Sequence, residues 1–339
     1  MTGRQRVMNV LCGEGVDQLP IMPIIHTNLA RQADMPLGRF FTDAPAMADA
    51  MVAGYRRFGF DGVQLTLGVT GEAEALGARV EQPPDGGPML KQYLLADFAQ
   101  LDTLRDRDPA GGGRMPMYQA AVRRVVDQIG DEAFVLSTLR GPLNIASQLR
   151  GVEDLLIDML ERPDDVERLL DFTTDVALAV SKASLASGAH ALVYGEATCS
   201  PNFISPDLYR RLVQPRHARL IEGVNAMGWP FAGLHVCGNI RPIFADLIAT
   251  GVQFLDVDYQ VPVEEAVALS AGRVVLRGNL DPTSIFLQGS VEQVREATAA
   301  VVRAAAGARW IMSSGCDIPP GAPAGNLDAF VQSVLTGGA

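Results

Sequence analysis

Residues 230–279 read PFAGLHVCGNIRPIFADLIATGVQFLDVDYQVPVEEAVALSAGRVVLRGN, and this stretch decides the fold. It contains three short apolar runs, Pro230–Val236, Phe254–Asp258 and Arg273–Asn279, separated by segments long enough to return the chain as a helix. The runs are apolar on both faces, which is typical of strands buried inside a parallel sheet. The stretch therefore predicts repeated strand-helix units of an α/β fold.

The same alternation extends over the whole chain. Five further runs are predicted as strands: Ile21–His26, Gly62–Gly68, Ala133–Leu139, Ala191–Ala197 and Arg309–Gly315. Helical periodicity with cap residues predicts helices over Ala44–Phe58, Met117–Ile129, Asp164–Ser187, Pro206–Met227 and Val291–Ala306. Eight strands alternating with helices predict one α/β domain over residues 1–339, a (β/α)₈ TIM barrel.

Two segments depart from this alternation. Residues 2–12 are expected to form an N-terminal helix at the bottom of the barrel. Residues 71–113 are expected to be an insertion at the barrel mouth after the second strand, with a hairpin formed by Ala78–Val80 and Leu90–Leu95. A Gly-rich linker, Ala110–Arg114, ends that insertion.

Composition excludes several classes of protein. With 48% hydrophobic and 20% charged residues, the 339-residue chain is expected to be globular rather than disordered. Its net charge of −11, without a basic cluster, argues against a nucleic-acid partner. There is no apolar run of the length that a membrane span needs and no signal-peptide pattern, so we expect a cytoplasmic protein with no membrane partner. Four cysteines are too few for a disulfide scaffold in a chain of this size.

Reactive side chains gather where the predicted strands end, which is where barrel enzymes place their active sites. His26, Glu196, His235 and Asn279 end or directly follow strands, and Cys316 follows the last one. His235 and Cys237 are two positions apart on a strand and therefore face one side. Cys316 can reach them across the mouth, which would make a three-ligand N/S site of the kind that zinc prefers. Core packing of the same residues remains the alternative.

Three segments carry a family resemblance: Leu234-His-Val-Cys-Gly-Asn239, Arg277-Gly-Asn-Leu-Asp-Pro282 and Ser313-Ser-Gly-Cys-Asp-Ile-Pro-Pro-Gly-Ala-Pro323 with Asn326-Leu327. They resemble the uroporphyrinogen decarboxylase superfamily and, within it, the zinc-dependent methylcobamide:thiol methyltransferases of the coenzyme M type. Thr70-Gly-Glu-Ala-Glu-Ala-Leu-Gly77 and Phe203-Ile-Ser-Pro-Asp-Leu-Tyr209 fit the same subgroup. The resemblance covers residues 5–335.

The chain departs from the decarboxylases proper. Their Arg-Gln-Ala-Gly-Arg segment, which holds the carboxylates of the tetrapyrrole, corresponds here to Arg31-Gln-Ala-Asp34-Met35, without a second arginine. The positions of their catalytic Asp and of their Gly-His are occupied by Leu65-Thr-Leu-Gly68 and Gly315-Cys316. Porphyrinogen decarboxylation is therefore disfavoured.

The resemblance implies an activity. Zn²⁺ bound by His235, Cys237 and Cys316 would take a small acceptor thiol in its open position and lower the pKa of that thiol. The thiolate would then attack the methyl group of a methyl-cobamide, which in this subgroup is delivered by a corrinoid protein. The thiol itself is not identified by the sequence, and a homodimer is possible.

Other residues at the strand ends receive candidate roles, each beside a structural one. Glu196 is a candidate catalytic residue that completes the metal site, or else a solvated carboxylate. Asp258 is a candidate catalytic residue and Asp256 a candidate substrate contact. Either aspartate could instead fix the tautomer of His235 or pair with an arginine.

His26, Asn239 and Asn279 are candidate substrate contacts, with a core histidine and turn-forming asparagines as the alternatives. The competing functions are a decarboxylase-like lyase, a zinc methyltransferase with a methylated folate as donor, and a non-catalytic corrinoid or tetrapyrrole carrier. A metal site with three protein ligands argues against the carrier, because structural zinc sites are usually closed by four.

Overall fold

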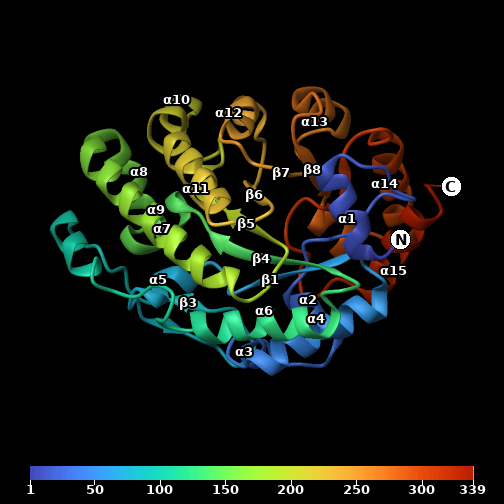
Figure 1. Ribbon diagram of the computed structural model, residues 1–339, viewed down its shortest axis with the longest axis horizontal. Coiled ribbons are helices and arrows are strands. Elements are labelled where there is room, and N and C mark those ends of the chain that lie inside the picture. Colours follow the sequence, from blue (N-terminus) through green and yellow to red (C-terminus); the bar gives the residue numbers. More distant parts are fainter. Residues whose placement is uncertain (339) are drawn as a thin grey trace.

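The computed structural model describes residues 1–338, and a curled parallel sheet forms its centre (Figure 1). Neighbouring strands follow the order β1-β4-β5-β6-β7-β8-β9. Their bounds are Gly62–Thr66, Phe134–Arg140, Ala191–Gly195, Ala232–His235, Phe254–Val257, Val275–Leu280 and Trp310–Ser314. Seven of the eight predicted strands are therefore present, all parallel and nearly all buried, as their apolar sequences indicated.

Helices surround the sheet on its outer side (Figure 1). The longer ones are α4 (Ala44–Phe58), α6 (Met115–Ile129), α7 (Pro142–Arg150), α8 (Val152–Glu161), α9 (Pro163–Leu185), α11 (Gln214–Ala226), α14 (Val291–Ala304) and α15 (Ala324–Leu335). The shorter ones are α2 (Thr27–Gln32), α3 (Leu37–Phe40), α12 (Phe244–Ala249) and α13 (Val263–Ser270). α4 shows how the sequence sets such bounds, because the Asp43 side chain accepts a hydrogen bond from the Ala46 amide and Gly59 ends the helix with φ +71°.

The predicted first strand, Ile21–His26, is wrong as a regular strand. Only Ile21 makes a bridge, with Met312 of β9, because Pro20 and Pro23 have no N–H to donate to a ladder. The segment still bonds to both edges of the sheet. On one side the Met22 amide donates to the Met312 carbonyl at 2.9 Å, and on the other the Asp61 amide donates to the Ile21 carbonyl at 2.7 Å.

The expected helix Pro206–Met227 is interrupted. Its first turn is α10 (Pro206–Leu208), a π-helical segment follows over Tyr209–Val213, and α11 then begins at Gln214. Pro215 explains the interruption, because it cannot donate an intrahelical hydrogen bond and its ring crowds the preceding turn.

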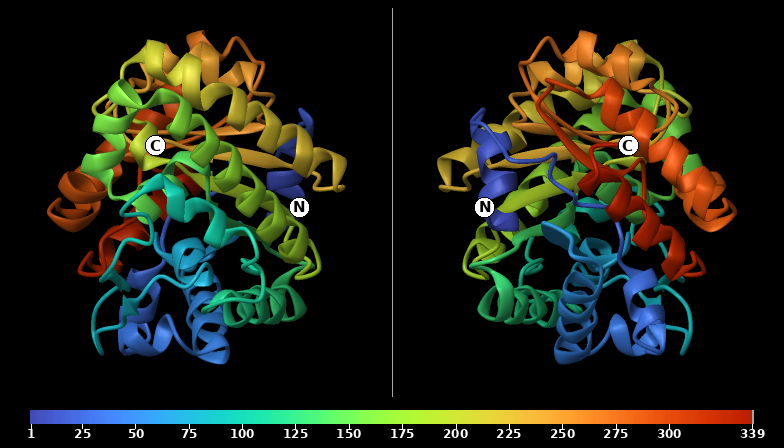
Figure 2. Two further views of the ribbon diagram at one scale, coloured as in Figure 1. Left: turned by 90° about the vertical axis from the view of Figure 1, so that its left-hand side faces the viewer. Right: turned by 90° about the vertical axis from the view of Figure 1, so that its right-hand side faces the viewer.

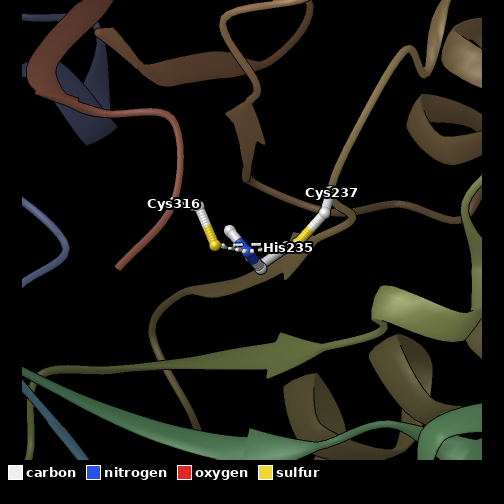
Figure 3. Close-up of side chains that lie close together, drawn as sticks. All are labelled: His235, Cys237 and Cys316. Atoms are coloured by element: carbon white, nitrogen blue, oxygen red, sulfur yellow. Dashed lines mark hydrogen bonds between the residues drawn. The ribbon is translucent and has the colours of Figure 1, made fainter. Parts of the chain in front are cut away.

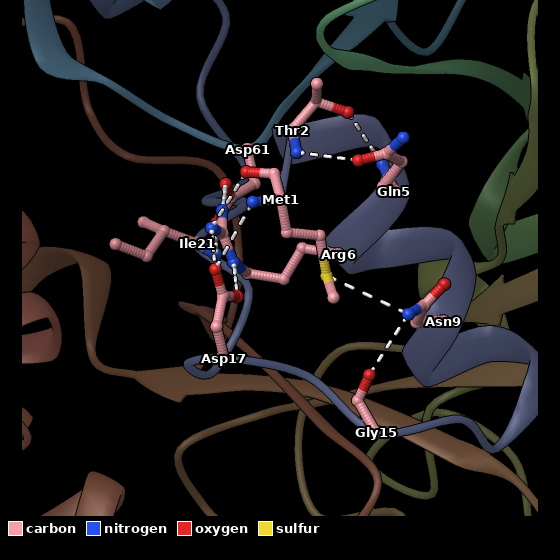
Figure 4. Close-up of polar contacts among 9 residues, drawn as sticks. All are labelled: Met1, Thr2, Gln5, Arg6, Asn9, Gly15, Asp17, Ile21 and Asp61. Atoms are coloured by element: carbon pink, nitrogen blue, oxygen red, sulfur yellow. Dashed lines mark hydrogen bonds and ion pairs between the residues drawn. The ribbon is translucent and has the colours of Figure 1, made fainter.

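Helix α1 (Gly3–Cys12) covers the end of the sheet where the strands begin (Figure 2). Val7 and Leu11 pack in one apolar cluster with Phe134 and Phe254, the first residues of β4 and β7. Arg6 fixes the helix there, because its guanidinium bonds to the buried Asp61 and to Asp17 (Figure 4). The other carboxylate oxygen of Asp61 accepts from the Ile21 amide at 2.7 Å.

The segment between β1 and β4 contains the irregular part of the chain. It begins with α5 (Gly71–Ala75), continues through β2 (Val80–Glu81) and β3 (Met89–Leu90), which pair antiparallel, and includes a 3₁₀ helix over Phe98–Leu104. The paired residues are fewer than the expected hairpin, and the predicted second arm past Leu90 is not a strand. Among residues 1–338, we find no helix with the length and apolarity of a membrane span.

Candidate active site

Three of the predicted site residues meet at the carboxyl ends of the strands (Figure 3). His235 is the last residue of β6, Cys237 follows it by two positions, and Cys316 lies in the loop after β9. The His235 Nε2 atom is 3.3 Å from Cys237 Sγ and 3.7 Å from Cys316 Sγ, and the two sulfur atoms are 3.7 Å apart. The structure thus brings together all three residues that the sequence marked as metal ligands.

These distances can be compared with a tetrahedral zinc site. Zn–S bonds of about 2.3 Å and a Zn–N bond of about 2.0 Å place two sulfur ligands about 3.8 Å apart, and a sulfur and a nitrogen about 3.5 Å apart. The sulfur–sulfur distance of 3.7 Å and the sulfur–nitrogen distances of 3.3 and 3.7 Å are close to these edges. One nitrogen and two sulfur ligands are also a donor set that zinc prefers, so the residues fit that ion.

A buried carboxylate orients the imidazole of His235. The ring uses Nδ1 to bond the Asp256 carboxylate at 3.0 Å, which leaves Nε2 directed at the two sulfurs. Arg277 bonds both oxygens of Asp256, at 2.7 and 2.6 Å. Burial alone would raise the pKa of Asp256, but Arg277 and His235 together lower it. The carboxylate is therefore charged and holds His235 in one tautomer.

The contact between the two thiols moves their pKa values in opposite directions. A hydrogen bond from Cys237, with further help from His235, lowers the pKa of Cys316. The same contact with Cys316, together with burial, raises the pKa of Cys237. The lowered pKa of Cys316 suits it to metal binding, because the thiolate is the form that binds a cation.

A cavity of about 260 Å³ opens next to these three residues. It is lined by Ile24, His26, Gln64, Thr66, Gly68, Val69, Thr138, Arg140, Gly195 and Ala197, and by His235, Cys237, Cys316 and Asp317. A volume of this size admits a small molecule beside the candidate ligands.

His26 lies in this cavity, as expected for a substrate contact, although it is not on a regular strand. It is 4% exposed, its Nδ1 atom is 2.9 Å from the Asp317 carboxylate, and its Nε2 atom has no hydrogen-bond partner among the described residues.

Asp256, within β7, and Asp258, directly after it, are both buried and contact other protein groups. Asp256 contacts His235 and Arg277, so the predicted tautomer role and the predicted arginine pair are combined in one residue. Asp258 accepts from the Gly238 amide at 2.9 Å and from the Gln260 amide at 3.0 Å, which fixes the loop that carries Cys237. Neither lines the cavity, in contrast to the expected substrate and catalytic contacts.

Glu196 also departs from its expected role. Its carboxylate accepts from the Leu143 and Asn144 amides at the start of α7, at 3.1 and 2.8 Å, and contacts His217 Nε2 at 2.9 Å. The side chain is fully buried and outside the cavity lining, so it neither reaches the three metal-ligand candidates nor is solvated. His217 and Cys199 complete this separate buried cluster.

The two asparagines have structural contacts. Asn239 accepts from the backbone and the guanidinium of Arg241, and Asn279 donates to the Val261 carbonyl at 2.8 Å. Neither is part of the cavity lining, and the turn-forming alternative describes Asn239.

Sequence reasoning missed the polar side of the cavity. Gln64 and Thr66 share one face of β1, and Thr138 and Arg140 share one face of β4. Polar residues at alternate positions of otherwise apolar strands were the available signal, because a buried parallel strand has no solvent face to explain them.

The family follows from comparison with known proteins. The sequence profile of the uroporphyrinogen decarboxylase (URO-D) family matches residues 2–336. The chain belongs to the uroporphyrinogen decarboxylase family. This confirms the resemblance that the motifs indicated.

Within the uroporphyrinogen decarboxylase family, curated relatives match this chain along nearly its whole length. The methylcobamide:CoM methyltransferase MtbA of Methanosarcina mazei is 26% identical, over 98% of this chain and 97% of its own. The methylcobamide:CoM methyltransferase MtaA of Methanosarcina barkeri is also 26% identical, with the same coverage of 98% and 97%. A solved methyltransferase structure from Methanosarcina mazei shares the fold, with a TM-score of 0.91, 23% identity and 99% of both chains covered.

Proposed function

We propose that this protein is an enzyme that transfers a methyl group from a methyl-cobamide to a small thiol. The observation that carries the proposal is the set His235, Cys237 and Cys316, whose mutual distances suit a tetrahedral zinc ion and which border the cavity. A zinc ion with three protein ligands keeps an open position, in which it supplies the Lewis acidity that lowers the pKa of a bound thiol.

The reaction balances as a methyl-cation transfer. The thiolate sulfur of the acceptor forms a bond to the methyl carbon, the cobalt–carbon bond breaks, and its electron pair stays on cobalt. The thiol proton is released on binding. Asp256 keeps the His235 ring in place, and Asp258 holds the loop that carries Cys237, so both are positioning residues.

The activities for which the relatives are named support this choice of donor and acceptor. Those names describe transfer between a methylcobamide and CoM, and the relatives match this chain from end to end. A separate corrinoid protein is the partner that we propose for delivery of the donor.

One observation weakens the decarboxylase alternative. Arg31, the remaining arginine of the segment that binds carboxylates in decarboxylases, pairs with Asp85 at 2.8 Å and does not line the cavity. The other two alternatives, a methyltransferase with a methylated folate as donor and a non-catalytic carrier, are tested by the experiment described next.

The test measures bound metal and methyl transfer together. Purified protein and its Cys237→Ser and Cys316→Ser variants are assayed for zinc content and for methylation of thiols by methylcobalamin. We expect about one zinc per chain and transfer in the parent, and loss of both in the variants while circular dichroism shows a folded chain. Cys199→Ala is the matched control, since this thiol is buried outside the cavity lining.

Other outcomes would contradict the proposal. Transfer that persists without bound metal would refute the role of the three residues. Zinc binding without transfer from methylcobalamin, but with transfer from a methylated folate, would replace the donor. Unfolding of both cysteine variants together with zinc loss would favour a structural metal.

For the fold, we propose that residues 20–25 take the place of the first strand in a closed (β/α)₈ barrel. They form hydrogen bonds to both edges of the seven-stranded sheet. The insertion between β1 and β4 would then lie at its mouth, because it follows the carboxyl end of β1.

A further inference from the structure

The loop that carries the candidate metal ligand Cys316 is poor in backbone donors. Between β9 and α15, residues 316–323 read CDIPPGAP, and the three prolines of this stretch have no N–H to donate. The Ile318 amide donates to the Ile24 carbonyl at 2.9 Å. The rest of the loop must be held largely through its carbonyl groups, by donors from elsewhere in the chain.

One buried side chain supplies these donors. Asn28 is the second residue of α2, and its Nδ2 atom donates to the carbonyls of Pro319 and Ala322, both at 3.0 Å. A longer contact of 3.3 Å reaches the Pro320 carbonyl. A side-chain amide has two N–H donors, so one of its hydrogens is shared. Asn28 is 0% exposed, so water does not compete for these contacts.

A second contact from the same segment reaches the residue next to the metal ligand. His26 directly precedes α2, and its Nδ1 atom is 2.9 Å from the Asp317 carboxylate. Residues 24–28 therefore contact the loop from Asp317 to Ala322. One short segment thus fixes the course of the loop.

Cys316 depends on its loop, because it lies beyond the end of β9. His235 ends β6 and is oriented by Asp256, and the loop of Cys237 is fixed by Asp258. The Cys316 sulfur is 3.7 Å from both His235 Nε2 and Cys237 Sγ (Figure 3). Metal–ligand distances hold to within about 0.2 Å, so a small shift of the loop would remove the third ligand from bonding distance.

We propose that Asn28 is a positioning residue for Cys316, and that its hydrogen bonds to the loop set the affinity of the site for zinc. Without these bonds the loop has more conformations, and metal binding must order it at a cost in affinity. The inference rests on the metal site of the proposed function and adds the residue that holds its third ligand. It does not depend on the methyl donor or on the acceptor.

The first test measures zinc affinity by competition with a chelator. In Asn28→Ala the affinity should fall about tenfold, at the lower end of the range of about 10–100-fold that is typical when a residue supporting a metal ligand is removed. Asn28→Ser keeps one shorter donor and should lose less affinity. The serine variant also carries the test if the alanine variant does not fold.

Asn326→Ala is the matched control. Asn326 is also buried, at 3% exposed, and its Nδ2 atom donates to the Phe286 and Gly289 carbonyls, each at 2.9 Å. Both alanine variants should therefore lose unfolding free energy in urea, but only Asn28→Ala should weaken zinc binding. Parent affinity in a folded Asn28→Ala, or equal weakening in both alanine variants, would overturn the inference.

A double variant tests whether Asn28 acts through Cys316. In Cys316→Ser, calorimetry at higher zinc concentration measures the weak binding that remains, and adding Asn28→Ala should change it about twofold or less. A further loss of about tenfold would refute the assignment to Cys316. Cobalt-loaded protein gives a spectroscopic signature, because the sulfur-to-cobalt charge-transfer absorption should weaken in Asn28→Ala and stay at the parent value in Asn326→Ala.

A metal-free probe separates this inference from the proposed function. Phenylarsine oxide binds pairs of close thiols such as Cys237 and Cys316, whose sulfur atoms are 3.7 Å apart. Its arsenic forms a bond to each sulfur, and its oxygen leaves with the two thiol protons as water. Asn28→Ala should bind the arsenical about tenfold more weakly than the parent, as for zinc, whereas Asn326→Ala should bind it like the parent.

This comparison decides the role of Asn28 even if the parent binds no zinc and the proposed function fails. A weaker arsenical complex in Asn28→Ala alone supports the positioning of Cys316. Equally tight complexes in the parent and in Asn28→Ala overturn it.

Discussion

Asp256→Asn tests whether a buried carboxylate sustains both the fold and the candidate metal centre. Asp256 is 1% exposed and accepts three hydrogen bonds, one from His235 at 3.0 Å and two from Arg277 at 2.7 and 2.6 Å. Asparagine keeps the shape, but it removes the charge and replaces one acceptor oxygen with an NH₂ group. At least one of the three donors then faces another donor.

Two separate costs follow from these contacts. Breaking a buried ion pair by removing one partner costs about 3–5 kcal/mol, and the remaining amide oxygen of asparagine places this variant near 3 kcal/mol of lost unfolding free energy. A histidine ligand that loses its carboxylate partner typically weakens metal binding by about 10–100-fold. At about 1.4 kcal/mol per tenfold change, this corresponds to about 1.4–2.8 kcal/mol of zinc affinity.

The assays are urea unfolding of the metal-free protein and zinc titration in competition with a chelator. The double variant Asp256→Asn/Arg277→Met separates the two costs. Removing the buried cation should restore much of the stability, because no uncompensated charge remains, whereas zinc affinity should stay low because His235 still lacks its carboxylate. The reasoning is refuted if Asp256→Asn unfolds within 1 kcal/mol of the parent and binds zinc as tightly.

Three other predictions concern buried charged or titratable side chains outside the candidate metal site. Burial lowers the pKa of His190 from its ordinary 6.5 to about 4. As the pH falls from about 6.5 to 4, the unfolded chain binds a proton that the folded chain does not, so the unfolding free energy should decrease. With screening by water taken into account, the decrease is about 1–2 kcal/mol. His190→Asn, which can still accept from the Val135 amide, should flatten that part of the urea-unfolding pH profile, and an unchanged slope contradicts it. Arg6→Met leaves the buried Asp61 without its cation and should cost about 3–5 kcal/mol in the same urea assay, whereas a loss below 1 kcal/mol argues against this fixation of α1. Glu196→Gln removes a charge from the start of α7 and should cost about 1–2 kcal/mol while zinc content stays at the parent value; zinc loss in a folded variant would return Glu196 to the metal site.

Much of the fold could be predicted from the sequence because buried parallel strands are continuous apolar runs. Seven predicted strands are present, and α4 has the expected bounds because Asp43 and Gly59 mark its ends. The prediction of a first strand was wrong because Pro23 has no N–H to donate to a neighbouring strand. The apolar pattern of Ile21–His26 concealed this effect. The break before α11 has a similar origin in Pro215.

The candidate site could be predicted where strand geometry alone fixes the direction of a side chain. His235 and Cys237 are two positions apart, and the parallel order of β6 and β9 brings Cys316 to the same end of the sheet. Glu196 was misplaced because it lies just past β5, where φ −136° and ψ 49° turn its side chain to α7. The orientation of a residue that leaves a strand depends on its local backbone, which periodicity does not report. Arg140 was missed as a site residue because its guanidinium occupies the space beside Gly195 of the neighbouring strand β5, and this neighbour is not evident from the sequence of β4.

The most direct test of the central claim is zinc K-edge X-ray absorption on the metal-loaded protein, before and after addition of a thiol acceptor. The account predicts about two sulfur ligands and one histidine nitrogen from the protein, and one additional sulfur ligand when 3-mercaptopropionate or 2-mercaptoethanesulfonate is added. A sulfur count that stays at two with saturating acceptor would contradict thiol activation at His235, Cys237 and Cys316, as would a metal environment that is unchanged in Cys316→Ser.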